Sequence, residues 1–242
     1  MGLIWNFPSK EYHLSSDKIE VWLAEFGVLS ENLTEFERVL SPDERERANR
    51  YRQQQDRVRF IVARGILRMI LAGYLGLSPS ELEFNYSERG KPQLKSNLSG
   101  IEFNVSHSED KGLFAIALNR RVGIDVEYIR PIEVLQLAKR FFRESEYLFL
   151  SGLEGREQVR AFFKFWTAKE ACVKATGEGL AGLETVEISL SKLESANRLE
   201  IHNVGCDWML QSLDLGENYC AAIAVEGKDY NIRHIDCYRN RQ

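Results

Sequence analysis

The stretch GIDVE, residues 123–127, places two carboxylates one residue apart inside an otherwise apolar segment. Side chains at positions i and i+2 of a β-strand point to the same face of that strand. If residues 122–128 are extended, Asp125 and Glu127 therefore lie side by side on one face, and the apolar side chains occupy the other. Two like charges held together repel each other, so the pair needs a compensating partner.

A second chemical pattern lies in the segment FFKFWTAKEACVKATGEGL. Phe162, Trp166, Glu170 and Lys174 are spaced by four residues, so on a helix they form one stripe, and its aromatic members indicate partial burial. The simpler interpretation is an exposed Glu-Lys pair at i,i+4, worth about 0.2–0.5 kcal/mol. That interpretation explains the pair but not its alignment behind two large aromatic side chains.

A partly buried Glu170 near Asp125 and Glu127 would complete a site of hard oxygen ligands for a cation. Mg²⁺ fits best, because it is usually held by one or two carboxylates together with substrate phosphates. These three acids therefore predict a metal ion and a phosphate together.

Basic residues gather in one region of a chain whose formal net charge is -4. Against four acids, the segment from residue 43 to 68 holds eight arginines, at positions 45, 47, 50, 52, 57, 59, 64 and 68. A solvated helix face accounts for most of them. Some of them could form an anion site, because the guanidinium fork matches a phosphate.

Other candidate phosphate donors lie in two short polar segments. Lys91 belongs to the turn RGKP, and Ser106, His107 and Ser108 lie in FNVSHSED, where a strand should end. A structural role in turns is the alternative for these residue types.

Two motifs are excluded as catalytic signatures. Ser106 and His107 do not form a nucleophile and base, because adjacent strand residues point apart and no G-x-S-x-G accompanies them. The segment GEGLAG, residues 177–182, matches G-x-G-x-x-G by letter. Its glycines close a helix, however, whereas the dinucleotide fingerprint follows a strand and opens a helix.

The elements that must position these residues mix helices and strands without a regular βαβ rhythm, which predicts an α+β fold. Ser41 and Pro42 indicate a helix start, and the apolar spacing predicts a helix through Leu75 with Gly76 as its C-cap. Further helices are expected at residues 133–142, 144–153 and about 157–176. Strands are expected at residues 19–26, 82–87, 101–106, 113–119, 122–129, 186–190, 207–215, 220–226 and 232–237.

A faint internal repeat is visible. The spacing from Phe60 to Gly76 equals that from Phe163 to Gly179, and a strand-like segment follows each glycine. Coincidence between common residues and a duplicated α/β half both account for this observation. A duplication would divide the chain near residue 118.

Composition limits the class of protein. A chain of 242 residues with 44% hydrophobic residues suits one large domain or two small ones. The net charge of -4 lacks the basic footprint of a nucleic-acid-binding protein. Four cysteines without metal-like spacing indicate free thiols. Because no secretory signal and no run of about 18–20 apolar residues is present, we expect a cytoplasmic protein without a membrane anchor.

Taken together, RGKPQL, FNVSHS, GIDVE and FWTAKEACVKATGEGL, in this order and at these separations, resemble the long, surfactin-type 4′-phosphopantetheinyl transferases. The resemblance runs from about Ser41 to Leu190. It implies an α+β fold of two similar α/β halves related by a pseudo-twofold axis. The N-terminal half, residues 1–117, would supply basic residues for coenzyme A, and the C-terminal half, residues 118–242, would supply the metal site and the catalytic helix.

The resemblance also implies roles for individual residues. Asp125, Glu127 and Glu170 match metal-binding acids, so that a Mg²⁺ ion would offset their repulsion. Glu170 also matches the base for the acceptor hydroxyl, and Lys174 matches a lysine at the transferred phosphate. The residues that match coenzyme A contacts are Lys91, Pro92, Ser106, His107 and Lys174.

The 3′-phosphate of coenzyme A would lie near Arg47 and Arg59, which match basic residues of the family. Glu44 departs from the pattern, since some relatives carry a base there. This departure implies a weaker grip on the 3′-phosphate or one that relies on Arg47 and Arg59.

The implied reaction transfers phosphopantetheine from coenzyme A to a serine of an apo acyl or peptidyl carrier protein and releases adenosine 3′,5′-bisphosphate. The segment after Pro131 lies where relatives receive the carrier, and Lys139, Arg140 and Arg143 could meet an acidic carrier helix. Because a pseudo-dimer needs no second chain, a monomer is expected. The alternatives are another Mg²⁺-dependent phosphotransferase and a non-catalytic module that binds coenzyme A or carrier proteins.

Overall fold

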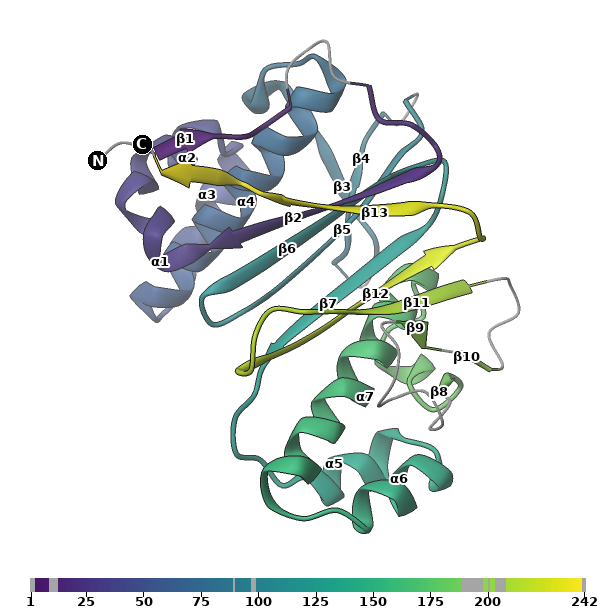
Figure 1. Cartoon of the computed structure of the whole chain (residues 1–242). Helices are drawn as coiled ribbons and strands as arrows, with labels where there is room; N and C mark the ends of the chain where they lie inside the picture. Colours follow the sequence, from purple (N-terminus) through teal and green to yellow (C-terminus); the bar gives the residue numbers. More distant parts are fainter. Residues whose placement is uncertain are drawn as a thin grey trace.

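Two four-stranded sheets lie next to each other, and helices cover them at opposite ends of the molecule (Figure 1). This arrangement confirms the α+β class. The computed structural model describes residues 3–8, 13–88, 90–96, 99–188, 198–199, 201–202 and 208–240.

The first half runs from a strand through a group of helices into an antiparallel hairpin. Its elements are β1 (Leu3–Trp5), β2 (Lys18–Glu25), α1 (Phe26–Leu29), η1 (Ser30–Asn32), α2 (Leu33–Val39), α3 (Pro42–Asn49), α4 (Gln54–Leu75), η2 (Pro79–Glu81), β3 (Phe84–Tyr86), β4 (Pro92–Leu94), β5 (Ile101–Ser108) and β6 (Lys111–Leu118). In its sheet, β6 lies between β2 and β5 and pairs antiparallel with both.

Local sequence explains the helix ends in this half. Ser41 is the N-cap of α3 and Pro42 lies in its first turn, as the sequence predicts, and Ser41 also forms a capping box with Glu44. The helical segment is interrupted, because α3 ends at Asn49 and α4 begins at Gln54. The predicted stop at Gly76 is confirmed by its left-handed φ of 65°.

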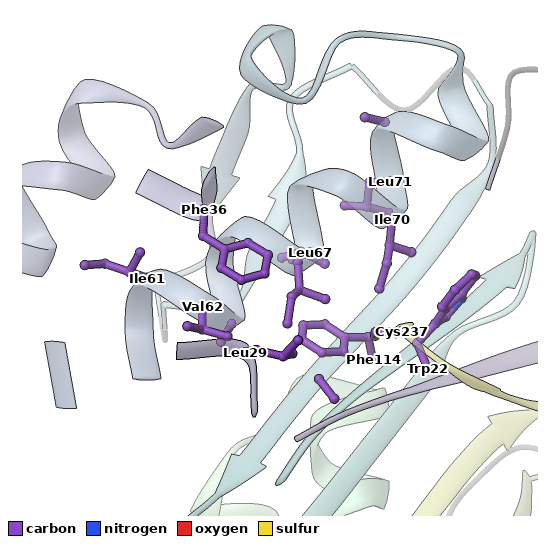
Figure 2. Packing of buried hydrophobic residues seen from close by; sticks show 14 of the residues in the cluster. Trp22, Leu29, Phe36, Ile61, Val62, Leu67, Ile70, Leu71, Phe114 and Cys237 are labelled. Atoms are coloured by element: carbon purple, nitrogen blue, oxygen red, sulfur yellow. The ribbon is translucent and has the colours of Figure 1, made fainter. Parts of the chain in front are cut away.

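The core of the first half lies between α4 and its sheet. Figure 2 shows side chains of α1, α2 and α4 meeting Trp22 of β2 and Phe114 of β6. Cys237, near the described end of the chain, is fully buried in the same cluster. Distant parts of the sequence therefore share one core.

The second half has a similar order of elements, with a strand, a group of helices that ends in a long helix, and a closing antiparallel hairpin. Its elements are β7 (Val122–Tyr128), α5 (Val134–Phe141), α6 (Glu144–Ser151), α7 (Gly155–Thr176), η3 (Leu180–Gly182), β8 (Glu187–Ile188), β9 (Arg198–Leu199), β10 (Ile201–His202), β11 (Trp208–Leu213) and β12 (Tyr219–Glu226). Its sheet has the order β7-β12-β11-β9. The small pairs β3-β4 and β8-β10 lie outside the main sheets.

The long helices α4 and α7 are the clearest repeat. Each has 22 residues and ends at a left-handed glycine, Gly76 or Gly177. A short 3₁₀ helix and a strand follow each of them. The structurally equivalent glycines are thus Gly76 and Gly177, whereas the sequence spacing matched Gly76 with Gly179. The segment GEGLAG closes a helix, as expected.

After β12 the chain returns to the first half. Strand β13 (Asn231–Asp236) pairs parallel with β2, and β14 (Tyr238–Asn240) pairs antiparallel with β1. Cys206, Arg89 and residues 189–190 of the expected strand 186–190 lie outside the described residues. Among the described helices, none is both long and apolar enough to cross a membrane.

Strands β5 and β7 run side by side in the same direction where the two halves meet, and side chains of β5 join them. The backbone N–H of Ile124 donates to Asn104 Oδ1 at 2.9 Å. The N–H of Val126 donates to Ser106 Oγ at 3.3 Å, and that of Tyr128 donates to Ser108 Oγ at 3.0 Å. We call these three contacts the β5–β7 ladder.

The alternation predicted for β7 is confirmed. Val122, Ile124 and Val126 are buried in the apolar layer between the two sheets. Gly123 lies on the opposite face, against α7, where a Cβ atom would come within 2.0 Å of the Ala171 carbonyl oxygen. The close approach of β7 to α7 therefore requires glycine at this position.

Substitution Gly123→Ala is expected to lower the free energy of unfolding by about 1–3 kcal/mol, because the added methyl group must push the strand and the helix apart. Urea unfolding measures this change. The control is Gly152→Ala, where a Cβ atom would lie 3.4 Å from its nearest neighbour and where φ of -81° suits alanine. Equal unfolding midpoints for the two variants would contradict this account of the packing.

Candidate active site

Three side chains from three elements meet at the junction of the halves. Lys174 Nζ, on α7, lies 2.6 Å from Asp125 Oδ1 on β7. It also donates to Ser106 Oγ on β5 at 3.1 Å, and Ser106 Oγ donates to the same Asp125 oxygen at 2.8 Å. The predicted residues Asp125, Lys174 and Ser106 are thus brought into direct contact.

Glu127 continues the acidic face of β7 by one position. Its Oε2 accepts a hydrogen bond from Ser108 Oγ at 3.0 Å and lies 3.8 Å from Arg130 Nη1. Burial raises the pKa of Glu127 above its ordinary value, and the Asp125 charge raises it further. Asp125 and Glu127 therefore interact electrostatically, as their spacing predicts.

Glu170 is partly buried on α7, one turn before Lys174. Burial raises the pKa of its carboxyl group, and the charges of Asp125 and Glu127 act in the same direction. Phe162 and Trp166, stacked at 5.7 Å between ring centroids, continue the stripe behind it. The stripe is therefore partly buried, and Lys174 pairs with Asp125.

A cleft of about 970 Å³ opens between the β3–β4 hairpin, β5 and the C-terminal end of α7. Glu170, Lys174, Lys91 and Pro92 line it, together with Arg121. Both halves therefore contribute charged side chains to one cavity that is open to solvent.

Lys91 links the first half to α7. Its Nζ donates to the backbone carbonyl of Lys174 at 2.8 Å, near the end of the helix where carbonyl groups lack helical partners. Burial lowers the pKa of Lys91, and the positive charges of Lys174 and Arg121 add to this effect. Lys91 thus holds the helical turn that carries Lys174.

His107 is the last residue but one of β5. Desolvation lowers its pKa below the ordinary value, and the charges of Lys174 and Arg59 lower it further. Its ring is 5.9 Å from that of Phe26. Arg59 itself pairs with Glu109 at 2.5 Å.

Arg47 contacts an aromatic ring of the first half. It is exposed on α3, and its guanidinium group lies 5.2 Å from the centre of the Phe60 ring. Within the described ranges, no hydrogen bond or ion pair joins Arg47 to the acids of β7 or to Lys174. The assignment of Arg47 to the coenzyme A site therefore stays a prediction.

Glu44 points inward. It is 1% exposed, lies 2.6 Å from Arg68 Nε, which is equally buried, and lies 3.5 Å from Arg64 Nε. Arg64 and Arg68 are therefore buried, unlike the solvated arginines that the sequence predicts for most of this region. Glu44 stabilises the packing of α3 on α4 through these pairs.

The three acids have the chemistry of cation ligands. Asp125 Oδ2 is buried and has no hydrogen-bond partner among the described residues. Hard carboxylate oxygens from Asp125, Glu127 and Glu170 have the chemistry that Mg²⁺ prefers. In the part of the chain that is described, however, no three acidic, histidine or cysteine side chains are already arranged as a metal site.

Sequence reasoning missed two groups near the site. Asn104 supplies the first contact of the β5–β7 ladder, and only its two-residue spacing from Ser106 could have revealed it. Lys169, beside Glu170, is fully buried and lies 2.8 Å from Glu146 of α6. This ion pair ties α6 to α7.

The residues predicted to face a carrier protein lie on α5 and at the start of α6. Lys139 and Arg140 are exposed on α5, and Arg143 is exposed at the start of α6. Leu148 on α6 is 60% exposed. Basic and apolar groups thus occur together on these two helices.

Comparison with known proteins gives one consistent result. Residues 121–224 match the model of the 4′-phosphopantetheinyl transferase superfamily, and residues 28–118 match that of the 4′-phosphopantetheinyl transferase N-terminal region. The chain is 42% identical to 4′-phosphopantetheinyl transferase HetI of Nostoc sp., over 88% of this chain and 90% of that protein. It is 28% identical to 4′-phosphopantetheinyl transferase Sfp of Bacillus subtilis, over 79% of this chain and 84% of that protein.

Substitution Arg59→Gln is expected to raise the pKa of His107 toward the ordinary histidine value. It removes one positive charge and frees the negative charge of Glu109, and both changes favour the imidazolium form. Titration of the imidazole signals by NMR measures this pKa. Arg50→Gln, which alters an exposed arginine of the same region, should leave it unchanged. A wild-type His107 that titrates above about 6.5 would contradict the described surroundings.

Proposed function

The chain belongs to the Sfp-type family of 4′-phosphopantetheinyl transferases, and on this premise we propose that it moves phosphopantetheine from coenzyme A to a serine hydroxyl of an apo acyl or peptidyl carrier protein. The other product is adenosine 3′,5′-bisphosphate. One observation supports this proposal most: the contact of Lys174 with Asp125 and Ser106 lies at the junction of the halves, with Glu170 one turn away in the same cleft.

In the proposed reaction Glu170 accepts the proton of the carrier serine. The serine oxygen then forms a bond to the phosphorus that carries pantetheine, and the bond from this phosphorus to the bridging oxygen breaks. The bridging oxygen leaves with adenosine 3′,5′-bisphosphate. The raised pKa of Glu170 suits this role, because a general base works best when its pKa approaches the working pH.

Lys174 would neutralise charge on the transferred phosphate. An ammonium group has three N–H donors, and in this structure they face Asp125 Oδ1, Ser106 Oγ and the Ile124 carbonyl, the last at 3.4 Å. Contact with a phosphate therefore requires Lys174 to exchange at least one of these acceptors.

Asp125, Glu127 and Glu170 would hold Mg²⁺, and the unpartnered Asp125 Oδ2 is the observation that supports this assignment. The ion would neutralise negative charge on the phosphates of coenzyme A. The carboxylates would otherwise repel the phosphates.

Coenzyme A is proposed to bind in the cleft between the halves. Lys91, Pro92 and Lys174 line this cleft, and Ser106 and His107 follow along β5. Arg59 and Arg47 would face the 3′-phosphate. Since Glu44 is committed to Arg64 and Arg68, it contributes no exposed negative charge beside them.

The carrier protein is proposed to dock on α5 and α6, where Lys139, Arg140 and Arg143 would meet acidic side chains and Leu148 would meet an apolar one. We further propose a cytoplasmic monomer that binds no nucleic acid. The division into residues 1–117 and 118–242 also remains a proposal, with β13 and β14 as segments that pair with the first half.

The direct test is the intact mass of an apo acyl carrier protein after incubation with this protein, coenzyme A and Mg²⁺, with an EDTA control. A gain of one phosphopantetheine that EDTA abolishes is expected. Calorimetric binding of coenzyme A without transfer to several carriers would favour a binding module. Transfer of phosphate to a small alcohol or nucleotide instead would favour another phosphotransferase.

Substitution Glu170→Gln is expected to reduce the transfer rate by about 10²–10⁴-fold, because the amide cannot accept the serine proton. Binding of coenzyme A, measured by calorimetry, should be largely retained. Glu157→Gln is the matched control, since Glu157 is an exposed acid in the first turn of α7. An unchanged rate in Glu170→Gln would remove Glu170 from the mechanism.

A further inference from the structure

Ser106 and Ser108 make the same pair of hydrogen bonds, two residues apart. Ser106 Oγ accepts from Val126 N at 3.3 Å and donates to Asp125 Oδ1 at 2.8 Å. Ser108 Oγ accepts from Tyr128 N at 3.0 Å and donates to Glu127 Oε2 at 3.0 Å. Each hydroxyl group of β5 therefore bridges one acid of β7 and the amide of the residue that follows it.

The register of the two strands creates this pattern. Both strands advance by two residues from one contact to the next, because side chains on one face of a strand recur with that period. Asn104 makes the preceding contact, with Ile124 N at 2.9 Å. The residue before Ile124, which corresponds to Asp125 and Glu127 in the other two contacts, is Gly123 and has no carboxylate. Two of the three contacts in the β5–β7 ladder thus hold a carboxylate.

The hydroxyl protons are committed to the acids. A serine hydroxyl group has one donor and two acceptor sites. Ser106 uses its donor on Asp125 and its acceptor sites on Val126 N and Lys174 Nζ, which also donates to it at 3.1 Å. A phosphate could accept from Ser106 only if the proton left Asp125.

The same bonds leave one oxygen of each acid for a cation. Ser106 and Lys174 both contact Asp125 Oδ1, and Asp125 Oδ2 is buried without a partner among the described residues. The contacts of Glu127 from Ser108 and Arg130 both go to Oε2. Glu127 Oε1 is therefore the oxygen that the Ser108 and Arg130 contacts leave to a cation, as Oδ2 is in Asp125.

We propose that Ser108 is a positioning residue that orients the Glu127 carboxylate for the metal ion, as Ser106 orients Asp125. This inference rests on the proposed function, since it concerns the same acids. Carboxylates that bind a metal are commonly held by such outer hydrogen bonds, and losing one typically costs about 10–100-fold in metal affinity. Ser108 acts through Glu127, because its one hydroxyl proton is donated to that acid.

The test measures Mn²⁺ binding to the full chain by the electron paramagnetic resonance signal of the free ion, with and without coenzyme A. Ser108→Ala is expected to weaken Mn²⁺ binding about 10-fold. Ser108→Thr, which keeps the hydroxyl group, should restore affinity to within about twofold. Ser30→Ala is the control, because the exposed Ser30 hydroxyl donates to the Gly27 carbonyl, away from the acids.

Urea unfolding of the same variants separates positioning from stability. A purely structural role would lower the unfolding midpoint of Ser108→Ala and leave its Mn²⁺ affinity unchanged, which would overturn the proposal. So would wild-type protein that binds no Mn²⁺. If Ser108→Ala does not fold, Ser108→Cys replaces it, since a thiol is a weak donor and the same loss of affinity is expected.

Failure of the proposed function would look different. One such result is a wild-type protein that transfers nothing to carrier proteins, while Ser108→Ala weakens Mn²⁺ binding and Ser108→Thr restores it. That result would contradict the proposed function but support the positioning role of Ser108. If the wild-type protein transfers phosphopantetheine but Ser108→Ala and Ser30→Ala bind Mn²⁺ equally well, the positioning role of Ser108 alone would be contradicted.

Discussion

The β5–β7 ladder is the interaction on which the rest of the site depends. Two edge strands meet there without a shared backbone ladder, and Asn104, Ser106 and Ser108 supply the acceptors that the amides of β7 need. Buried amides without partners would each cost about 1–3 kcal/mol. The three side chains therefore fix both the distance and the register between the halves.

This constraint brings residues from distant parts of the sequence to one point. Gly123 lets α7 pack directly on β7, which brings Lys174 to Asp125. Lys91 holds the carbonyl end of the same helix from the first half. The positive charge of Lys174 offsets the negative charge of Asp125. Glu127 and Glu170 remain partly buried acids, and the pKa of each is raised. Such acids suit a cation or a proton transfer.

Periodic patterns predicted much of this arrangement from the sequence. The two-residue period of β7 and the four-residue stripe of α7 correctly indicated which side chains share a face, because both signals are local. The interruption between α3 and α4, the inward orientation of Glu44 and the return of β13 to β2 were not predicted. The last two depend on contacts between distant segments. Asn104 was missed for the same reason, since its partner lies 20 residues away.

Amide hydrogen exchange at Ile124, Val126 and Tyr128, measured by NMR on the full chain, tests the β5–β7 ladder most directly. These amides donate to side chains of β5 rather than to backbone carbonyl groups. The account predicts that the three amides are protected from exchange as strongly as amides of the core strands. In the variant Asn104→Ala, exchange of the Ile124 amide is expected to speed up more than that of the other two. Exchange of all three wild-type amides as fast as in exposed loops would contradict the account, because the two halves would then not be joined through β5 and β7.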